Sequence, residues 1–368
     1  IFLPQILILF CFIIVLEDSG YLSRTAFIME KIMRNFGLSG KSVIPLISSF
    51  ACAVPGIMAT RVISEPKARL ITILSAPFMT CSARLPVYAL LIGAFIPDTY
   101  YINGWVSLKG LVLLGLYFLG IFGGIFTAVI MKTFMPAETS SGFIIELFPY
   151  RNPNLKSMLI KLYDRALIFL KRAGTIIFSV AILIWALAYF PRPIEIKNQF
   201  DIERDLVVAV ANVEERTAQI VQINQEEKAA YLEHSWLGQM GKSLAPVFKP
   251  LGWDWKVTAA FIGGMPAREV VIAALGTIYA IGDATNSESL LQDKLKNAFW
   301  DDGKPIFTLP MTLGLLVFYA FCLQCFATIA VIRRETNTWR WPILAWTYMT
   351  SLSYLAAFIT YRLVSLII

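Results

Sequence analysis

Long apolar stretches separated by short charged segments dominate this chain. A membrane crossing needs about 20 consecutive apolar residues, and eight stretches approach or exceed that length. They are Ile1–Leu16, Ser42–Thr60, Leu70–Ile96, Leu111–Met131, Ala166–Phe190, Val257–Ile281, Phe307–Ile332 and Ile343–Ile368. We therefore expect an all-α polytopic membrane protein, with about seven or eight transmembrane or re-entrant segments.

The stretch Ser42–Thr60 differs from an ordinary membrane span. It has no charge, but it contains Pro45, Pro55 and Gly56, which disfavour a continuous helix. A broken helix at membrane depth is stable only where neighbouring protein or a wet cavity satisfies the freed backbone groups. We expect a re-entrant or discontinuous segment here.

Charge in the connecting segments predicts the orientation of the chain. The run Arg151–Arg172 contains six Lys or Arg residues and one Asp, which is typical of a cytoplasmic loop. The turn Pro97–Ser107 has no Lys or Arg, so we expect it to face outward, together with the long loop Pro191–Lys256. Within that loop the acidic stretch Phe200–Tyr231 could form a solvated helix or remain loose.

Composition supports the membrane class. Apolar residues make up 57% of the 368 residues and charged residues 15%, which is too apolar for an ordinary soluble domain. The net charge of +7 comes from basic residues clustered at the ends of apolar stretches rather than along one face. We therefore expect membrane lipid, and no nucleic acid, as a partner.

Two segments resemble each other and predict an internal repeat. The residues Phe-Ala-Cys-Ala-Val-Pro-Gly-Ile-Met-Ala-Thr-Arg at 50–61 are echoed by Gln-Cys-Phe-Ala-Thr-Ile-Ala-Val-Ile-Arg at 324–333. Each is followed by a linker containing Pro and by an apolar segment with a Met-Thr pair, at 79–80 and 349–350. Repeated halves are a feature of transporters. The orientation of the repeats in the membrane stays open.

Sulfur side chains are the main candidates for chemistry in the apolar segments. The cysteines there are Cys11, Cys52, Cys81, Cys322 and Cys325, and their spacing fits neither a zinc finger nor a secreted disulfide framework. The only histidine, His234, belongs to the expected outer loop. A metal site inside the membrane would have to use sulfur, oxygen and backbone carbonyls, which ferrous iron accepts.

Four of these cysteines lie near helix breaks or repeats. Cys52 adjoins a Val-Pro-Gly sequence, and Cys81 follows the thioether of Met79 by two residues. Cys322 and Cys325 are three residues apart, so they would share a helix face. A lone buried cysteine behaves as a small hydrophobe, but this arrangement favours a function for Cys52 and Cys325.

Charged side chains in or at the ends of apolar segments are the second set of candidates, because such groups are expensive in a membrane. They are Glu17, Asp18, Arg84, Arg268 and Glu269. Arg268 and Glu269 follow Gly-Gly-Met-Pro-Ala and could simply hold a broken helix in place. Glu17 and Asp18 could be ordinary interfacial charges.

The chain contains no nucleotide-binding loop. The pattern G-x-x-x-x-G-K-[ST] fails at Gly40-Lys41-Ser42, because Asn35 stands where the first glycine belongs. It fails at 241–243 in the same way. We expect no catalytic residues and no GTP hydrolysis by this chain alone.

Several motifs together resemble the membrane domain of the FeoB-type ferrous iron transport protein. They are Leu-Glu-Asp-Ser-Gly-Tyr-Leu-Ser-Arg at 16–24, Gly-Lys-Ser at 40–42, Cys-Ala-Val-Pro-Gly-Ile-Met-Ala-Thr-Arg at 52–61, Ala-Pro-Phe-Met-Thr-Cys-Ser-Ala-Arg-Leu-Pro-Val-Tyr at 76–88, Glu-Leu-Phe-Pro-Tyr-Arg at 146–151 and Ala-Arg-Glu-Val-Val at 267–271. The similarity runs from the first residues to the C-terminus.

This resemblance implies a permease core for ferrous iron uptake across the bacterial inner membrane. It implies two gate regions and a pore lined by cysteines, with Cys52, Cys81, Cys322 and Cys325 as candidate ligands or gate residues and Met79 as a further sulfur ligand. It also implies an N-terminal cytoplasmic GTPase domain that holds GTP and Mg²⁺, small cytoplasmic Feo accessory proteins and a possible homo-oligomer. Gln324 departs from the family pattern, in which a proline often precedes the second thiol.

The expected organisation follows from the resemblance. Residues 1–40 are an incoming span and cytoplasmic connector, 41–140 the first gate repeat, 141–190 a cytoplasmic segment and span, 191–256 an extramembrane periplasmic loop and 257–368 the second gate repeat. The first residue is not Met, so we expect a chain cut to the membrane core or a natural split gene. Two alternatives to iron transport are a nucleoside-type or other solute transporter that shares the gate fold, and a membrane scaffold without transport.

Overall fold

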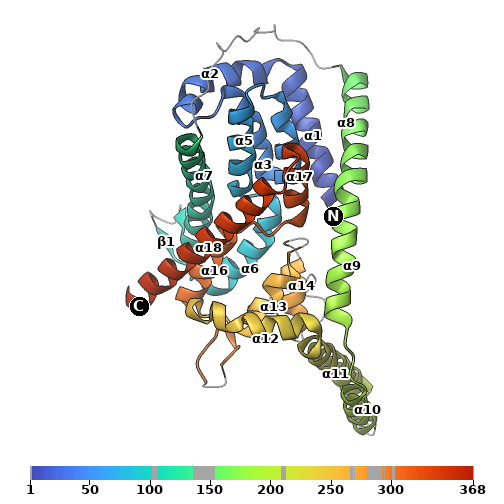
Figure 1. Cartoon of the computed structure of the whole chain (residues 1–368). Helices are drawn as coiled ribbons and strands as arrows, with labels where there is room; N and C mark the ends of the chain where they lie inside the picture. Colours follow the sequence, from blue (N-terminus) through green and yellow to red (C-terminus); the bar gives the residue numbers. More distant parts are fainter. Residues whose placement is uncertain are drawn as a thin grey trace. The chain divides into compact units, whose positions relative to one another are not determined.

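The computed structural model describes residues 2–101, 106–135, 154–208, 213–265, 268, 270–279, 292–293, 295–300 and 303–367 (Figure 1). The chain divides into two compact units. The first unit contains 1–83, 114–177 and 320–353, and the second contains 84–113, 178–319 and 354–368. Several helices continue from one unit into the other.

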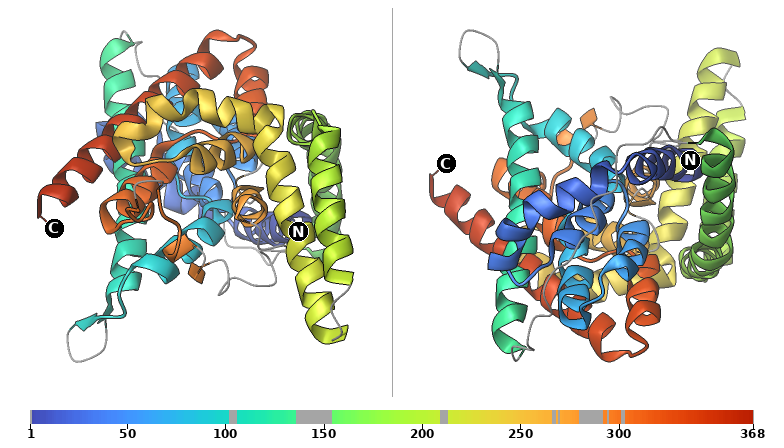
Figure 2. Two further views of the ribbon diagram at one scale, coloured as in Figure 1. Left: turned by 90° about the horizontal axis from the view of Figure 1, so that it is seen from below. Right: turned by 90° about the horizontal axis from the view of Figure 1, so that it is seen from above.

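The first unit consists of helices from three parts of the chain. Its elements are α1 (Phe2–Asp18), α2 (Tyr21–Asn35), η1 (Gly40–Ser42), α3 (Val43–Ala51), α4 (Ala53–Ala59), η2 (Thr60–Val62), α5 (Pro66–Ser75), η3 (Ala76–Phe78), most of α7 (Leu108–Phe134), α8 (Leu155–Phe169), the π-helical turn η5 (Leu170–Gly174), α17 (Phe326–Thr336) and the first half of α18 (Arg340–Ile367). Helices α1 and α8 lie side by side (Figure 2).

The second unit holds the remaining elements. They are η4 (Ser82–Arg84), which begins in the first unit, α6 (Leu85–Phe95), β1 (Tyr100–Tyr101), β2 (Val106–Ser107), α9 (Thr175–Tyr189), α10 (Ile194–Val208), α11 (Val213–His234), α12 (Trp236–Phe248), η6 (Lys249–Leu251), α13 (Trp255–Gly263), α14 (Val270–Ile278) and α16 (Leu309–Phe321). The two strands pair antiparallel, with Tyr100 opposite Ser107. Apart from this short hairpin and one isolated bridge, the described regular structure is helical.

The expected class of an all-α polytopic membrane protein is confirmed. Among the described residues, four stretches are long and apolar enough to cross a membrane: Pro66–Phe95, Leu108–Phe134, Leu309–Thr336 and Arg340–Ile367. A bent pair, Phe178–Tyr189 and Ile194–Val207, makes five if it counts as one span. The described parts of the other expected apolar stretches form shorter helices. These stretches are apolar but do not meet the length of a span in one helix, so the sequence predicts more segments than the four or five found here.

The expected interruption of Ser42–Thr60 is present, but at Cys52 rather than at the prolines. Cys52 has an extended backbone (φ −157°, ψ 132°) between α3 and α4. Pro45 and Pro55 each occupy the third position of a helix, where a backbone N–H has no partner within the helix. These prolines therefore start helices instead of ending them.

Two expected loops are also helical. The basic run 151–172 forms α8 from Leu155 onward, so the prediction of a loop was wrong for the part of it that the structure describes. In the expected outer loop, α10 packs against α11 (Figures 1 and 2). Arg204 connects them by donating to Asn224 at 2.9 Å and to Glu227.

One apolar core organises the first unit. Buried residues from α1, α4, α5, η3, α17 and α18 form it, among them Ile14, Ile57, Leu74, Phe78 and Met349. Burying large apolar side chains of this kind contributes about 1.5–3 kcal/mol each. Cys52 and Cys325, about 270 residues apart in the sequence, pack against this same core.

Candidate functional site

Three helix breaks carry the candidate ligands. We call them the Cys52 break, between α3 and α4; the Cys81 break, residues 79–81 between η3 and η4; and the Cys325 break, residues 322–325 between α16 and α17. All of these residues belong to the first unit. In each break the chain leaves the helical conformation within an otherwise apolar stretch.

Cys52 and Cys325 have equivalent local positions. Each is the N-cap residue of the helix that follows, with an extended backbone at φ −157°, ψ 132° and φ −103°, ψ 107°. The following helices α4 and α17 pack against each other. This geometry agrees with the repeat predicted from the sequence. The likeness ends at the Met-Thr pairs, because Met79 lies in a break whereas Met349 lies inside the continuous helix α18.

The Cys81 break adjoins the Cys52 break. The Ser82 hydroxyl donates a hydrogen bond to the Ala51 carbonyl at 2.8 Å, so the residues that flank the two cysteines are tied together. Cys52 and Cys325 pack against the same apolar core, and the helices that follow them, α4 and α17, are in contact. The structure therefore brings together three cysteines that lie far apart in the sequence.

Helix α7 holds the Cys81 break in place through a face of glycines. A Cβ atom added at Gly120 would lie 2.7 Å from the Phe78 carbonyl oxygen, and one at Gly124 would lie 2.6 Å from the Met79 Cε. Small residues on a membrane helix allow such close backbone approach. Met79 itself is buried in the core of the unit.

Exposure differs among the predicted sulfur ligands. Cys52, Cys81 and Cys325 are half-buried, whereas Cys322 is 1% exposed. Among the described residues, no three His, Cys, Asp or Glu side chains are arranged to hold a metal ion. The thiols thus lie along connected breaks and do not form a closed cage. No disulfide joins the five cysteines, which are all free.

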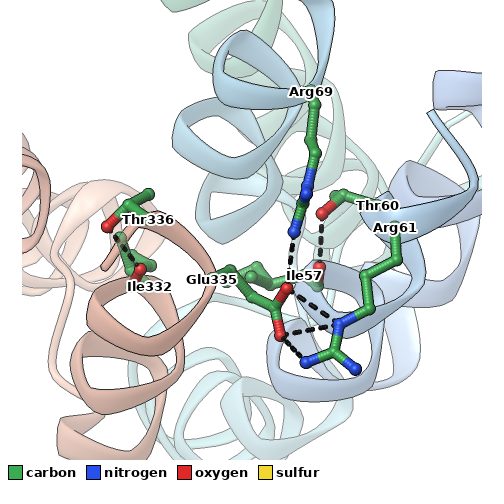
Figure 3. A network of polar contacts seen from close by, with 7 residues as sticks. All are labelled: Ile57, Thr60, Arg61, Arg69, Ile332, Glu335 and Thr336. Atoms are coloured by element: carbon green, nitrogen blue, oxygen red, sulfur yellow. Dashed lines mark hydrogen bonds and ion pairs between the residues drawn. The ribbon is translucent and has the colours of Figure 1, made fainter. Parts of the chain in front are cut away.

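A cluster of three charged residues connects η2, α5 and α17 (Figure 3). Glu335 on α17 accepts hydrogen bonds from Arg61 Nη2 at 2.6 Å and Arg69 Nη2 at 2.7 Å. The Glu335 side chain is 2% exposed, and the Arg61 and Arg69 side chains are 51% and 32% exposed. The hydrogen bonds that Arg61 donates to Glu335 raise the pKa of the Arg61 guanidinium, and burial opposes this shift. One carboxylate therefore joins η2, α5 and α17.

Three of the predicted charged candidates, Asp18, Arg84 and Arg268, have described side chains. Asp18, the last residue of α1, pairs with Lys161 Nζ at 2.7 Å on α8. Arg84 is buried at the start of α6, and Arg268 donates from Nη1 to the Tyr319 carbonyl at 3.2 Å. This contact joins Arg268, two residues before α14, to the end of α16. The side chain of Glu17 and the whole of Glu269 lie outside the described residues.

Sequence reasoning missed several features of this region. It did not select Glu335 or Arg69 or the glycine face of α7, and it did not predict that the side chains of Thr80 and Gln324 are buried without a hydrogen-bond partner. The run Gly-Ile-Phe-Gly-Gly at 120–124 was the available signal for the glycine face. The Glu335 pairing had no sequence signal, since its partners lie 266 and 274 residues away.

Comparison with protein families agrees with this arrangement. The model of the Gate family, described as nucleoside recognition, matches residues 1–95 and 170–339, which is more than half of the chain. A second model, the ferrous iron transport protein B C terminus, matches residues 113–165. The chain belongs to the Gate family, as a membrane region of the FeoB type. The matched parts of the Gate family contain all three breaks.

The curated relatives described here are named as Fe(2+) transport proteins. An Fe(2+) transport protein A/Fe(2+) transporter FeoB fusion protein of Porphyromonas gingivalis is 40% identical over 99% of the chain. Fe(2+) transporters FeoB of Leptospira interrogans and Campylobacter jejuni are 40% and 35% identical, each over 98% of it. The chain spans about half the length of these relatives, at 42%, 48% and 52%. No solved structure matches the chain.

Proposed function

We propose that this chain is the permease core for ferrous iron uptake across the bacterial inner membrane. The observation that carries the proposal is that Cys52, Cys81 and Cys325 lie at helix breaks that are connected through the Ser82–Ala51 hydrogen bond and the packing of α4 against α17. Thiolates, thioethers and carbonyl oxygens are ligands that ferrous iron accepts. The FeoB relatives, which match nearly the whole chain, are named as Fe(2+) transporters.

The arrangement of the sulfur atoms suits an ion that is transported rather than permanently bound. Conduction needs sites that bind well enough for entry and weakly enough for release. A closed cage of thiolates would hold iron too tightly, and the described residues contain no such cage. Fe²⁺ would pass from Cys52 to Cys325 and Cys81 in steps, exchanging waters for sulfur and for carbonyls of the unwound backbone.

The helix junction at Glu335 suits a gate. Because Arg61 follows α4 and Glu335 lies on α17, their ion pair ties the two helices that begin at Cys52 and Cys325. Separation of this pair would let the two cysteines move apart. In this proposal an attached cytoplasmic GTPase domain, which holds GTP and Mg²⁺, drives or permits that movement.

Further partners belong to the same proposal. The fusion of an Fe(2+) transport protein A to the Porphyromonas relative supports association with small cytoplasmic Feo proteins. The apolar helices imply a lipid environment. Assembly of several copies into a homo-oligomer is part of the proposal as well. The chain itself acts as a transporter domain and not as an enzyme.

A transporter for nucleosides is the alternative that the description of the Gate family raises. A polar organic solute needs several convergent hydrogen-bonding groups in its pocket. The buried polar atoms without a partner near the three breaks are few, and the relatives described above transport Fe(2+) by name. A scaffold without transport would leave the thiols without a role.

Uptake by anaerobic proteoliposomes separates these functions. The full-length protein that contains this chain is reconstituted with GTP inside, and uptake of Fe²⁺ and of uridine is measured against empty vesicles. Iron transport predicts saturable Fe²⁺ uptake and uridine uptake at the level of empty vesicles. Uridine uptake without Fe²⁺ uptake would establish the alternative, and the absence of both would favour a scaffold.

A further inference from the structure

Gln324 is a buried amide in the Cys325 break. Its side chain is 1% exposed, and neither Oε1 nor Nε2 has a hydrogen-bond partner among the described residues. A primary amide offers two donors and an acceptor with two lone pairs. Leaving all of these unsatisfied in a protein interior is costly, whereas an apolar side chain of similar shape would not be. Packing alone does not account for glutamine at this position.

The surroundings of Gln324 point to an ion. Leu323, on one side of Gln324, belongs to the apolar core of the first unit, and Cys325, on the other side, packs against that core together with Cys52. The Cys81 break has a similar feature, because the side chain of Thr80 is 0% exposed and its hydroxyl is also without a partner. Phe78 and Phe321, which precede the two breaks, are in edge-to-face contact with ring centroids 5.9 Å apart. Two buried polar side chains without a hydrogen-bond partner thus directly precede Cys325 and Cys81 in the sequence.

The chemistry of an amide oxygen favours some metal ions over others. Zn²⁺ prefers four-coordinate tetrahedral sites rich in sulfur, whereas an amide oxygen adds a harder ligand suited to ions that keep more ligands and waters. Gln324 Oε1 could replace one hydration water of the ion, and Nε2 could donate to another. The amide would therefore favour a partly hydrated, higher-coordinate ion over a tetrahedral one.

We propose that Gln324 is a ligand of the transported divalent ion and a selectivity residue, acting together with the thiols of Cys325 and Cys52. This inference rests on the proposed iron-permease function. It adds an oxygen ligand to the sulfur ligands, and it assigns to this amide the preference for Fe²⁺ over Zn²⁺.

The test uses the full-length protein with Gln324→Leu, which removes the polar atoms and leaves an apolar side chain of roughly similar size, and with Gln324→Glu, which keeps an oxygen. The control is Gln239→Leu, at an exposed glutamine on α12 that donates to the His234 carbonyl. Fe²⁺ and Zn²⁺ fluxes into anaerobic proteoliposomes are compared at equal reconstituted amounts. Circular dichroism and gel filtration confirm that each variant is folded.

We expect Gln324→Leu to lower the Fe²⁺-to-Zn²⁺ flux ratio by at least about tenfold, the size of effect typical of groups around a metal site. Gln324→Glu retains most of the Fe²⁺ flux, and Gln239→Leu matches the parent protein. An unchanged ratio in a folded Gln324→Leu protein overturns the inference.

A binding measurement gives a second readout. Co²⁺ added to the detergent-solubilised protein reports its coordination through visible absorption, which is weak for six ligands and strong for tetrahedral sites. The parent protein is expected to show weak bands, and Gln324→Leu stronger ones. Identical spectra would contradict the inference. Cys52→Ser is measured in parallel to separate the proposed thiol path from the role of the amide. Retained Fe²⁺ flux in Cys52→Ser would contradict the thiol path itself. An unchanged flux ratio in Gln324→Leu, with flux lost in Cys52→Ser, would contradict only the role of the amide.

Discussion

Arg61 and Glu335 form a two-pronged ion pair at the junction of the two helices that start at the candidate cysteines. Arg61 Nε lies 2.9 Å and Nη2 2.6 Å from the two carboxylate oxygens, and Arg69 Nη2 reaches the first of these oxygens at 2.7 Å (Figure 3). Forked contacts of this kind combine strength with fixed geometry. The Glu335 side chain is 2% exposed, so its removal would leave two arginines facing a cavity.

We expect Glu335→Ala to destabilise the first unit by about 2 kcal/mol, because charge-assisted hydrogen bonds contribute about 1.5–3 kcal/mol. Arg61 is half exposed, so Arg61→Ala should cost less, about 1 kcal/mol or below. The thermal midpoint in detergent measures both. Glu233→Ala is the control, since its pair with Lys242 is more than 40% exposed on both sides and should be nearly neutral. Equal midpoints for Glu335→Ala and Glu233→Ala would refute this prediction.

Gly120→Ala should displace the Cys81 break. The new methyl carbon would lie 2.7 Å from the Phe78 carbonyl oxygen, and overpacking of this kind costs about 1–3 kcal/mol. The matched control is Gly115→Ala on the same helix, where nothing lies within 4 Å of the added atom. Because alanine is the better helix former, Gly115→Ala should be neutral or stabilising by up to about 1 kcal/mol. Thermal midpoints measured side by side decide, and a Gly120→Ala protein as stable as Gly115→Ala contradicts the packing described here.

Asp254 introduces a pH dependence in the second unit. It lies outside the stretches that could span the membrane, and its Oδ1 accepts from the Val257 N–H at 2.8 Å as the N-cap of α13. Burial raises the pKa of the Asp254 carboxyl above its usual value near 3.8, although hydrogen bonds to the backbone oppose the shift. The folded state therefore binds this proton more tightly than the unfolded state. The stabilisation that comes from this protonated carboxyl is present at pH values below the pKa of Asp254 in the unfolded chain. It is lost as the pH rises through the pKa of Asp254 in the folded protein.

Asp254→Asn should remove this loss, since an asparagine keeps the cap and carries no charge. The thermal midpoint of the variant, minus that of the parent protein, should increase between pH 4 and pH 7. Asp254→Ala, which loses the cap, should be less stable than Asp254→Asn by about 1 kcal/mol. A difference between Asp254→Asn and the parent that stays constant with pH would show that Asp254 does not titrate as stated.

The two late cysteines should respond differently to substitution. Cys322 is 1% exposed, so serine there places a hydroxyl in a tightly packed interior and lowers the thermal midpoint. Cys325 is half-buried and packs against the same core as Cys52, so serine there lowers Fe²⁺ flux with a smaller effect on stability. Both quantities are measured on both variants. The assignment of Cys325 rather than Cys322 to the path is wrong if Cys322→Ser abolishes flux at an unchanged midpoint.

The sequence predicts local features of this fold better than contacts between distant segments. Hydrophobic stretches located the four stretches that are long enough to span a membrane, and the predicted repeat paired the segments 50–61 and 324–333, in which Cys52 and Cys325 are both N-cap residues. The position of the first break was predicted imprecisely because Pro55 is tolerated in the first turn of a helix. The partner of Glu335 and the contact of Gly120 with Phe78 depend on which helices meet, and periodicity carries no information about that.

The central claim is that a path for ferrous iron runs past thiols at the connected helix breaks. Fe²⁺ flux into anaerobic proteoliposomes, measured for the full-length parent protein and for Cys52→Ser and Cys325→Ser at equal reconstituted amounts, tests it most directly. The proposed function predicts that both variants fold normally and lose most of the flux. Normal transport by both folded variants would contradict it and would make these cysteines packing residues.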